Sequence, residues 1–174
     1  MTNLQRLRGL ALTSTCALLF SLVGIAHADE TTEPLAAENA TFFDRATSAL
    51  DDTLGEALSL LGVPYKRGGT SPTSGFDCSG FVRHVFQESA GLILPHNAKA
   101  MAREGETVDK QALQPGDLVF FNTMRRAFSH VGIYLGDGKF VHSPRKGGKV
   151  RIEDMQESYW KKRYNGARRV APDQ

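Results

Sequence analysis

Hydrophobic and polar positions along the 174-residue chain change their spacing near residue 113. Before that point, apolar residues recur every three or four positions, which is the spacing of a helix with one buried face. One such helix starts at Phe42 and ends before Gly62, and a second fills residues 78–90. A shorter helix is expected over residues 98–103.

From residue 113 onward, short apolar runs separated by turn residues predict β-strands. We expect strands at 118–121, 130–135, 139–142, 150–152 and 167–170, with a helix over 153–163. Gly136-Asp137-Gly138 is typical of a tight hairpin between the second and third of these strands. Helices followed by an antiparallel meander indicate an α+β fold, and we see no internal repeat and no second domain.

Residues 1–28 have the pattern of a secretory signal peptide. Two arginines precede an apolar stretch over residues 10–23, and Ala26-His27-Ala28 fits cleavage after Ala28. The apolar stretch is short for a membrane span, so we expect export to the periplasm without a stable membrane anchor. Residues 29–40 are acidic and poor in large apolar side chains, which predicts a flexible lead-in to a domain over residues 41–174.

Cleavage would leave Cys78 as the single cysteine, because Cys16 lies inside the signal. A single cysteine in an exported chain is an intermolecular bridge, a buried thiol or a reactive group. From residue 57 onward the chain has 18 Lys and Arg against 11 Asp and Glu. This balance suits an anionic partner such as cell wall or lipid head groups, and equally a solvated surface of no specific purpose.

Cys78 stands at the start of the second predicted helix, directly after Asp77. Asp77 would cap that helix, and the positive end of the helix dipole would favour a thiolate at Cys78. The alternative is a small buried hydrophobic residue, which most free cysteines are.

A cysteine nucleophile needs a base and a group that orients the base. His130 and His142 lie on the two strands joined by the hairpin, and its register brings them within a residue or two of one another. One imidazole could face the thiol of Cys78 while the other holds it through a ring nitrogen. Two structural histidines, or a zinc site formed with Cys78, are alternatives, although no CxxC or HxxxH spacing supports zinc.

Five stretches of this sequence stand out together. They are Gly62-Val63-Pro64-Tyr65 with Gly68-Gly69-Thr70, Phe76-Asp77-Cys78-Ser79-Gly80-Phe81-Val82, Leu113-Gln114-Pro115-Gly116-Asp117-Leu118-Val119-Phe120-Phe121, Ser129-His130-Val131-Gly132-Ile133-Tyr134-Leu135-Gly136 and Phe140-Val141-His142-Ser143. In this order they resemble the NlpC-type cysteine peptidases of bacterial cell walls. The resemblance implies a papain-like fold, with the nucleophile at the N-terminus of a helix packed on a small antiparallel sheet.

The resemblance also implies a role for each matching residue. Cys78 would be the nucleophile, His130 the base and His142 the polar residue that orients His130. Tyr65 would direct its hydroxyl toward the scissile carbonyl and form an oxyanion site with the backbone N–H of Cys78.

Four further residues are expected to contact the substrate. Asp77 and Ser79 flank the nucleophile and, by resemblance, would help to position the substrate. Arg67 replaces a residue that is often aromatic in the family, and His96 follows Pro95 where the family usually has arginine.

These features predict an exported peptidoglycan endopeptidase that cuts a stem-peptide amide next to meso-diaminopimelate. The bond is either D-γ-glutamyl-diaminopimelate or the D-alanyl-diaminopimelate cross-link. We expect a monomer that acts on peptidoglycan stem peptides, with no metal or cofactor and no nucleic-acid partner. A papain-like amidase or acyltransferase, a non-catalytic wall-peptide-binding protein and a redox role for Cys78 are the alternatives.

Overall fold

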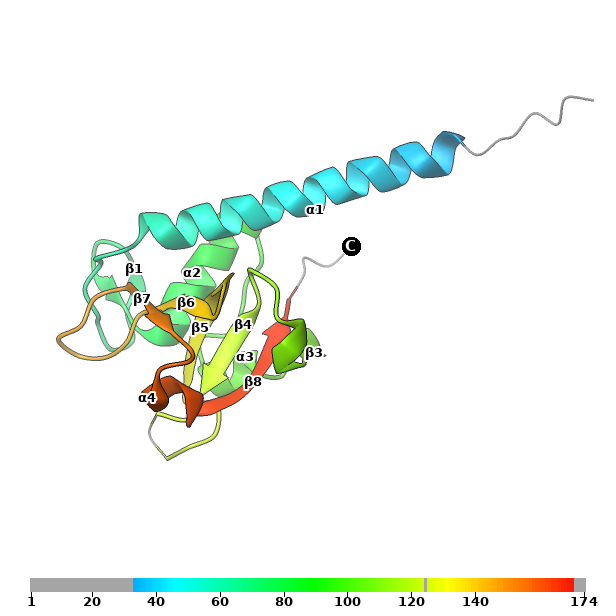
Figure 1. Cartoon of the computed structure of the whole chain (residues 1–174). Helices are drawn as coiled ribbons and strands as arrows, with labels where there is room; N and C mark the ends of the chain where they lie inside the picture. The colour runs from blue at the N-terminus through cyan, green and yellow to red at the C-terminus, as the bar shows by residue number, and fades with distance from the viewer. Residues whose placement is uncertain (1–32, 124, 171–174) are drawn as a thin grey trace, which may run out of the picture.

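The computed structural model describes residues 33–123 and 125–170, with side chains from residue 44 onward (Figure 1). Its helices are α1 (Glu33–Ser59), α2 (Cys78–Ala90), α3 (Ala98–Met101), the 3₁₀ turn η1 (Lys110–Ala112) and α4 (Ser158–Lys161). Helix α1 packs along α2 through its buried residues Thr53 and Ala57, so both helices expected from the apolar spacing are confirmed. In this part of the chain no helix is long and apolar enough to cross a membrane.

Helix α1 starts at Glu33, earlier than the start at Phe42 that the apolar spacing predicts. Residues 33–40, expected as part of a flexible lead-in, are therefore helical. Alanine and glutamate are common in this stretch, and both have high helix propensity without any need for an apolar face. The predicted signal peptide at residues 1–28 lies outside the described residues.

A six-stranded antiparallel sheet forms the second half of the domain. In spatial order its strands are β3 (Glu106–Val108), β8 (Tyr164–Arg169), β4 (Leu118–Phe121), β5 (His130–Gly136), β6 (Lys139–His142) and β7 (Arg151–Asp154). The predicted hairpin joins β5 to β6, with Asp137 at a positive φ of 50°. A separate small hairpin, β1 (Thr70–Ser71) with β2 (Gly75–Phe76), precedes α2. Neither this hairpin nor β3 was expected, because strands of two or three residues leave no period to detect.

The four residues of β4 are all fully buried, because the sheet is covered on both faces. Leu118 and Phe120 pack into the larger core cluster with α1 and α2. Val119 and Phe121 point to the opposite face and pack into a second cluster around Trp160. This two-sided burial explains why β4 reads as a continuous apolar run rather than an alternating one.

The helix expected over residues 153–163 is wrong over most of its length. Glu153 and Asp154 belong to strand β7, where they pair with Phe140 and Lys139 of β6. Only Ser158–Lys161 form a single helical turn, α4. Pairing with β6 overrides the local helix propensity, and the consequence is that Glu153 lies in the sheet beside β6.

Candidate active site

Cys78 is the first residue of α2, and Asp77 fixes that helix start. The Asp77 carboxylate accepts hydrogen bonds from the backbone N–H of Gly80 at 2.7 Å and from that of Gly68 at 3.0 Å. The first bond is the N-cap expected from the sequence, and the second joins the preceding loop to the helix. A Cβ at Gly80 would collide with the carbonyl oxygen of Gly69, so only glycine permits this close approach. These contacts fix where the Cys78 side chain emerges.

The surroundings of Cys78 favour its protonated thiol. Burial, together with the charge of Asp77, raises its pKa to about 11, although backbone hydrogen bonds from Val131, Ser79 and Cys78 itself oppose the shift. Burial therefore opposes the thiolate that the helix dipole would favour. Attack by Cys78 then requires a base that takes the proton.

His130 and His142 lie on β5 and β6 and hydrogen-bond to each other. Nε2 of His130 and Nδ1 of His142 are 2.6 Å apart. The register pairs Ile133 with Val141, so the two histidines are two residues out of direct opposition, as the hairpin predicts. Gly132 lets β6 approach β5 closely, because a Cβ there would lie 2.7 Å from Cδ2 of Phe140, 2.8 Å from the carbonyl oxygen of Val141 and 3.1 Å from the Cβ of His142.

Both imidazoles are buried against Trp160. The indole stacks on His130 with ring centroids 5.6 Å apart and meets the edge of His142 at 5.1 Å. Burial lowers the pKa of each histidine, and the proximity of His142 lowers that of His130 further, well below its usual value. Both rings are therefore neutral near pH 7, and His130 can accept a proton.

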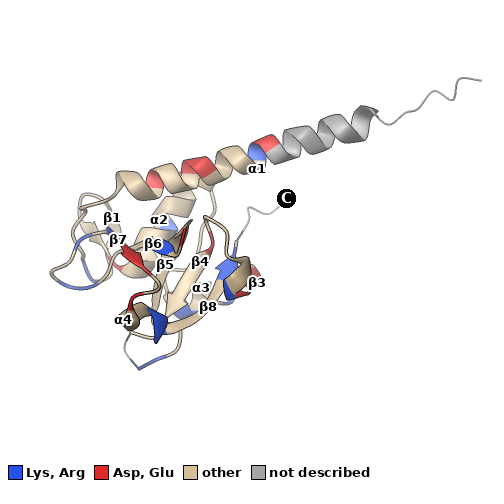
Figure 2. Ribbon diagram, in the orientation of Figure 1, with Lys and Arg blue, Asp and Glu red and all other residues tan. Residues whose placement is uncertain are grey.

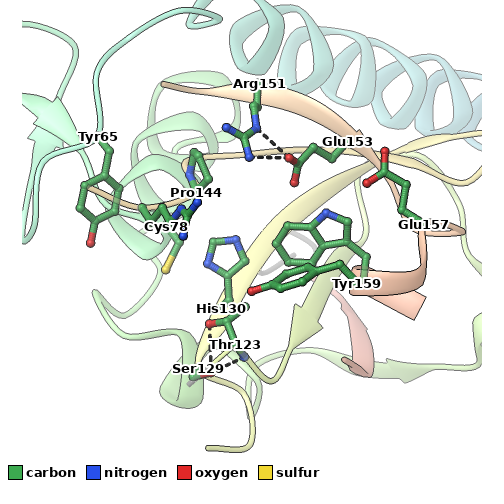
Figure 3. Close-up of a pocket in the computed structure, with 12 residues that line it drawn as sticks. Tyr65, Cys78, Thr123, Ser129, His130, Pro144, Arg151, Glu153, Glu157 and Tyr159 are labelled. Atoms are coloured by element: carbon green, nitrogen blue, oxygen red, sulfur yellow. Dashed lines mark hydrogen bonds and ion pairs between the residues drawn. The ribbon is translucent and has the colours of Figure 1, made fainter. Parts of the chain in front are cut away.

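A cavity of about 510 Å³ opens beside Cys78 and His130. Figure 3 shows the Cys78 thiol, the His130 ring and the Tyr65 hydroxyl around this space. Burial and the neighbouring Cys78 and Asp77 raise the pKa of Tyr65, so its hydroxyl stays a hydrogen-bond donor. Charged side chains of both signs line the cavity: Arg145 and Arg151 are exposed, and Glu153 and Glu157 lie with them. Figure 2 shows acidic and basic residues together on β7.

The other four residues expected to bind substrate lie around the helix start instead of lining the cavity. Asp77 accepts a hydrogen bond from the Ser79 hydroxyl at 3.1 Å and contacts Nε2 of His96 at 3.2 Å. Ser79 is buried and His96 is exposed. Arg67 is exposed on the loop that carries Tyr65 and is not among the residues that line the cavity.

Three residues that shape the site were not identified from the sequence. Gly132 permits the close approach of β6 to β5, Trp160 packs on both imidazoles, and Glu153 contacts Nε2 of His142 at 2.9 Å. The position of Gly132 between two candidate histidines, and the occurrence of Trp160 as the chain's one tryptophan, were signals that could have drawn attention to them. Glu153 gave no such signal because it was assigned to a helix.

The zinc alternative does not fit the histidine pair. The facing nitrogens of His130 and His142 are joined by a hydrogen bond, so they do not converge on one ion with the sulfur of Cys78. Across residues 33–123 and 125–170, no group of three or more His, Cys, Asp or Glu side chains is arranged to hold a metal ion.

The sequence profile of the NlpC/P60 family matches residues 62–169 of this chain. The chain is 41% identical over 120 residues to the murein DD-endopeptidase MepH of Escherichia coli, covering 67% of this chain and 44% of MepH. It is 46% identical over 115 residues to the gamma-DL-glutamyl hydrolase of Bacillus subtilis, covering 66% of this chain and 28% of that protein. The chain therefore spans less than half the length of these two relatives.

Solved structures show the same arrangement of elements. An NlpC/P60 family protein from Bacillus cereus superposes with a TM-score of 0.65 at 39% identity, over 71% of this chain and 40% of that one. The NlpC/P60 domain of the peptidoglycan hydrolase SagA gives a TM-score of 0.62 at 29% identity, over 70% of this chain and 98% of that domain. The α+β, papain-like fold expected from the sequence is confirmed.

Proposed function

Because the chain belongs to the NlpC/P60 family, we propose that it is a cysteine peptidase that hydrolyses peptidoglycan stem peptides. The observation that carries this proposal is the thiol of Cys78 and the His130–His142 pair around one open cavity. The relatives support the substrate class, since two of them are named as a murein endopeptidase and a gamma-DL-glutamyl hydrolase.

In the proposed reaction, Cys78 attacks an amide carbonyl of the stem peptide. His130 takes the thiol proton as the Cys78 sulfur forms a bond to the carbonyl carbon. This proton transfer is necessary because the raised pKa of the thiol disfavours a thiolate before attack. The oxyanion is stabilised by the backbone N–H of Cys78 and the hydroxyl of Tyr65. His130 then gives the proton to the leaving amine, and water hydrolyses the thioester to regenerate the enzyme.

We propose that the bond cut lies next to meso-diaminopimelate. The D-γ-glutamyl-diaminopimelate bond and the D-alanyl-diaminopimelate cross-link both have neighbouring carboxylates, and Arg145 at the cavity is a guanidinium that could pair with one of them. One relative is named as a gamma-DL-glutamyl hydrolase and the other as a murein DD-endopeptidase, and these names support keeping both bonds in the proposal. Asp77, Ser79, Arg67 and His96 are proposed to act on the substrate from the helix start beside the nucleophile.

Export stays part of the proposal. A murein-acting enzyme works at the cell wall, and a signal peptide cleaved after Ala28 would deliver this chain to the periplasm as a monomer without a stable anchor. Detection of the mature N-terminus at Asp29 in a periplasmic extract would test this step.

Mass spectrometry of muropeptides tests the proposed reaction and identifies the bond. Purified peptidoglycan is treated with the protein, then digested with a muramidase and compared with an untreated sample. Loss of tetrapeptide stems with appearance of dipeptide stems indicates the γ-glutamyl bond, whereas conversion of cross-linked dimers to monomers indicates the D-alanyl bond. An unchanged muropeptide profile would contradict the proposed function.

A further inference from the structure

The hydrogen-bond chain that begins at His130 continues past His142 to Glu153 on the neighbouring strand. Oε2 of Glu153 lies 2.9 Å from Nε2 of His142, whose other ring nitrogen contacts His130. Oε1 of Glu153 accepts a hydrogen bond from Nε of Arg151 at 2.7 Å, and a terminal nitrogen of Arg151 pairs with the same oxygen (Figure 3). Each oxygen of the carboxylate therefore has a different partner.

Glu153 acts only as a hydrogen-bond acceptor in this series of contacts. Burial opposes its ionisation, but hydrogen bonds from His142 and Arg151 outweigh burial and lower its pKa to about 2. A carboxylate without a proton has nothing to donate, so the hydrogen in the contact with His142 belongs to Nε2 of that histidine.

The position of this one hydrogen decides the protonation of both imidazoles. Burial lowers the pKa of His142 although its hydrogen bond to Glu153 raises it, so the ring is neutral near pH 7 and carries one hydrogen. With that hydrogen on Nε2, Nδ1 of His142 is an acceptor. Nε2 of His130 must then donate in the 2.6 Å contact, which leaves Nδ1 of His130 as an unprotonated nitrogen.

We propose that Glu153 is a positioning residue that sets the tautomers of His142 and His130, so that His130 presents a free Nδ1 to accept the Cys78 proton. Arg151 holds one oxygen of the Glu153 carboxylate and thereby orients the other oxygen toward His142. The expected effect on kcat rests on the proposed function. The tautomers themselves do not, because they exist without substrate.

Glu153→Gln provides a sharp test because it keeps the size of the side chain and makes one end a donor. The donors of Arg151 hold the amide oxygen, so the amide N–H₂ faces Nε2 of His142. Two facing donors are avoided only if His142 moves its hydrogen to Nδ1, and His130 then carries its hydrogen on Nδ1, toward the thiol. The wrong tautomer should lower kcat on peptidoglycan about 10²–10⁴-fold with a smaller change in KM.

Removal of Arg151 should partly reverse this effect. In Glu153→Gln with Arg151→Met, the amide is free to rotate and to present its oxygen to His142. The double variant should regain at least about tenfold in kcat over Glu153→Gln, although Arg151→Met alone gains nothing. A structural role for the Glu153–Arg151 pair predicts the opposite, a double variant no better than the single one.

Glu56→Gln is the matched control. Glu56 also faces a histidine, with Oε1 at 3.5 Å from Nε2 of His84, in a contact between α1 and α2 that does not line the cavity. This variant should keep the wild-type kcat, and a loss equal to that of Glu153→Gln would overturn the inference.

The deciding measurement is the tautomer of His130 by ¹⁵N-edited NMR on the substrate-free protein at pH 7. We expect hydrogen on Nε2 in the wild type and on Nδ1 in Glu153→Gln. Hydrogen on Nδ1 in the wild type overturns the inference even if the variant fails to fold, and so does an unchanged tautomer in a folded variant. A wild-type protein that releases nothing from peptidoglycan refutes the proposed function, and the tautomer measurement still decides the role of Glu153.

Discussion

The reactivity of the Cys78 thiol should rise continuously with pH. Burial and Asp77 raise its pKa to about 11, while burial keeps His130 neutral, so the resting site holds a thiol and an imidazole and not an ion pair. The perturbation is a change of pH from 6 to 10 in the substrate-free protein. The quantity measured is the second-order rate of alkylation by iodoacetamide.

The expected magnitude follows from the thiolate fraction. A pKa of about 11 gives roughly one thiolate in ten thousand molecules at pH 7, against a few per cent for an ordinary cysteine. The thiolate fraction of Cys78 is therefore about 300-fold smaller than that of an ordinary cysteine. A more basic thiolate is a stronger nucleophile, which offsets this difference by about tenfold. Cys78 should therefore react about 30-fold more slowly than the same thiol in the unfolded chain, with a tenfold rise per pH unit.

Mass spectrometry of the Cys16→Ser variant measures this rate at one site, because Cys78 is then the sole cysteine. The same variant unfolded in urea supplies the matched reference. A rate that stays constant between pH 6 and 9, at or above the unfolded value, would show a preformed thiolate–imidazolium pair and would refute the reasoning. It would also mean that the helix dipole outweighs burial at this position.

Three further outcomes follow from the same geometry. His142→Asn should keep part of the activity on peptidoglycan, because an amide can still orient His130, whereas His130→Ala should lose about 10²–10⁴-fold; equal losses in the two variants would contradict this division of labour. Tyr65→Phe should lower kcat about 10²-fold with little change in KM if its hydroxyl stabilises the oxyanion, and a change confined to KM would assign it to binding. Urea denaturation should show that the free energy of unfolding falls as the pH is lowered below 6.5, by about 1.4 kcal/mol per pH unit for each buried histidine. The reason is that the histidines of the unfolded chain bind protons in this range, whereas the folded rings, with their lowered pKa, do not. The slope should be halved in His142→Asn, and a stability independent of pH would show that the folded histidines are protonated as readily as the unfolded ones.

Local patterns predicted the parts of the site that depend on local structure. Asp77 before an apolar-faced segment predicted the helix start at Cys78, and the cap is present. The hairpin after Leu135 predicted that His130 and His142 approach one another, and their rings are in contact. In both cases the relevant neighbours lie within about a dozen residues along the chain.

The features that depend on long-range packing could not be predicted in this way. Burial beside Asp77 raises the pKa of the Cys78 thiol, and this burial comes from the packing of distant elements and not from the local helix start. Glu153 reaches His142 because residues 151–154 pair with β6, although the local sequence favours a helix. Trp160 covers the two histidines from a single helical turn that periodicity cannot place.

The most direct test of the central claim is the release of new amino termini from purified peptidoglycan by the wild-type protein and by Cys78→Ala. The thiol is the atom that forms the acyl-enzyme, and alanine removes it at a half-buried position with little change to the fold. We predict amine release by the wild type and none above background by Cys78→Ala, with both proteins folded by circular dichroism. Equal release by the two proteins would contradict the assignment of Cys78 as the nucleophile.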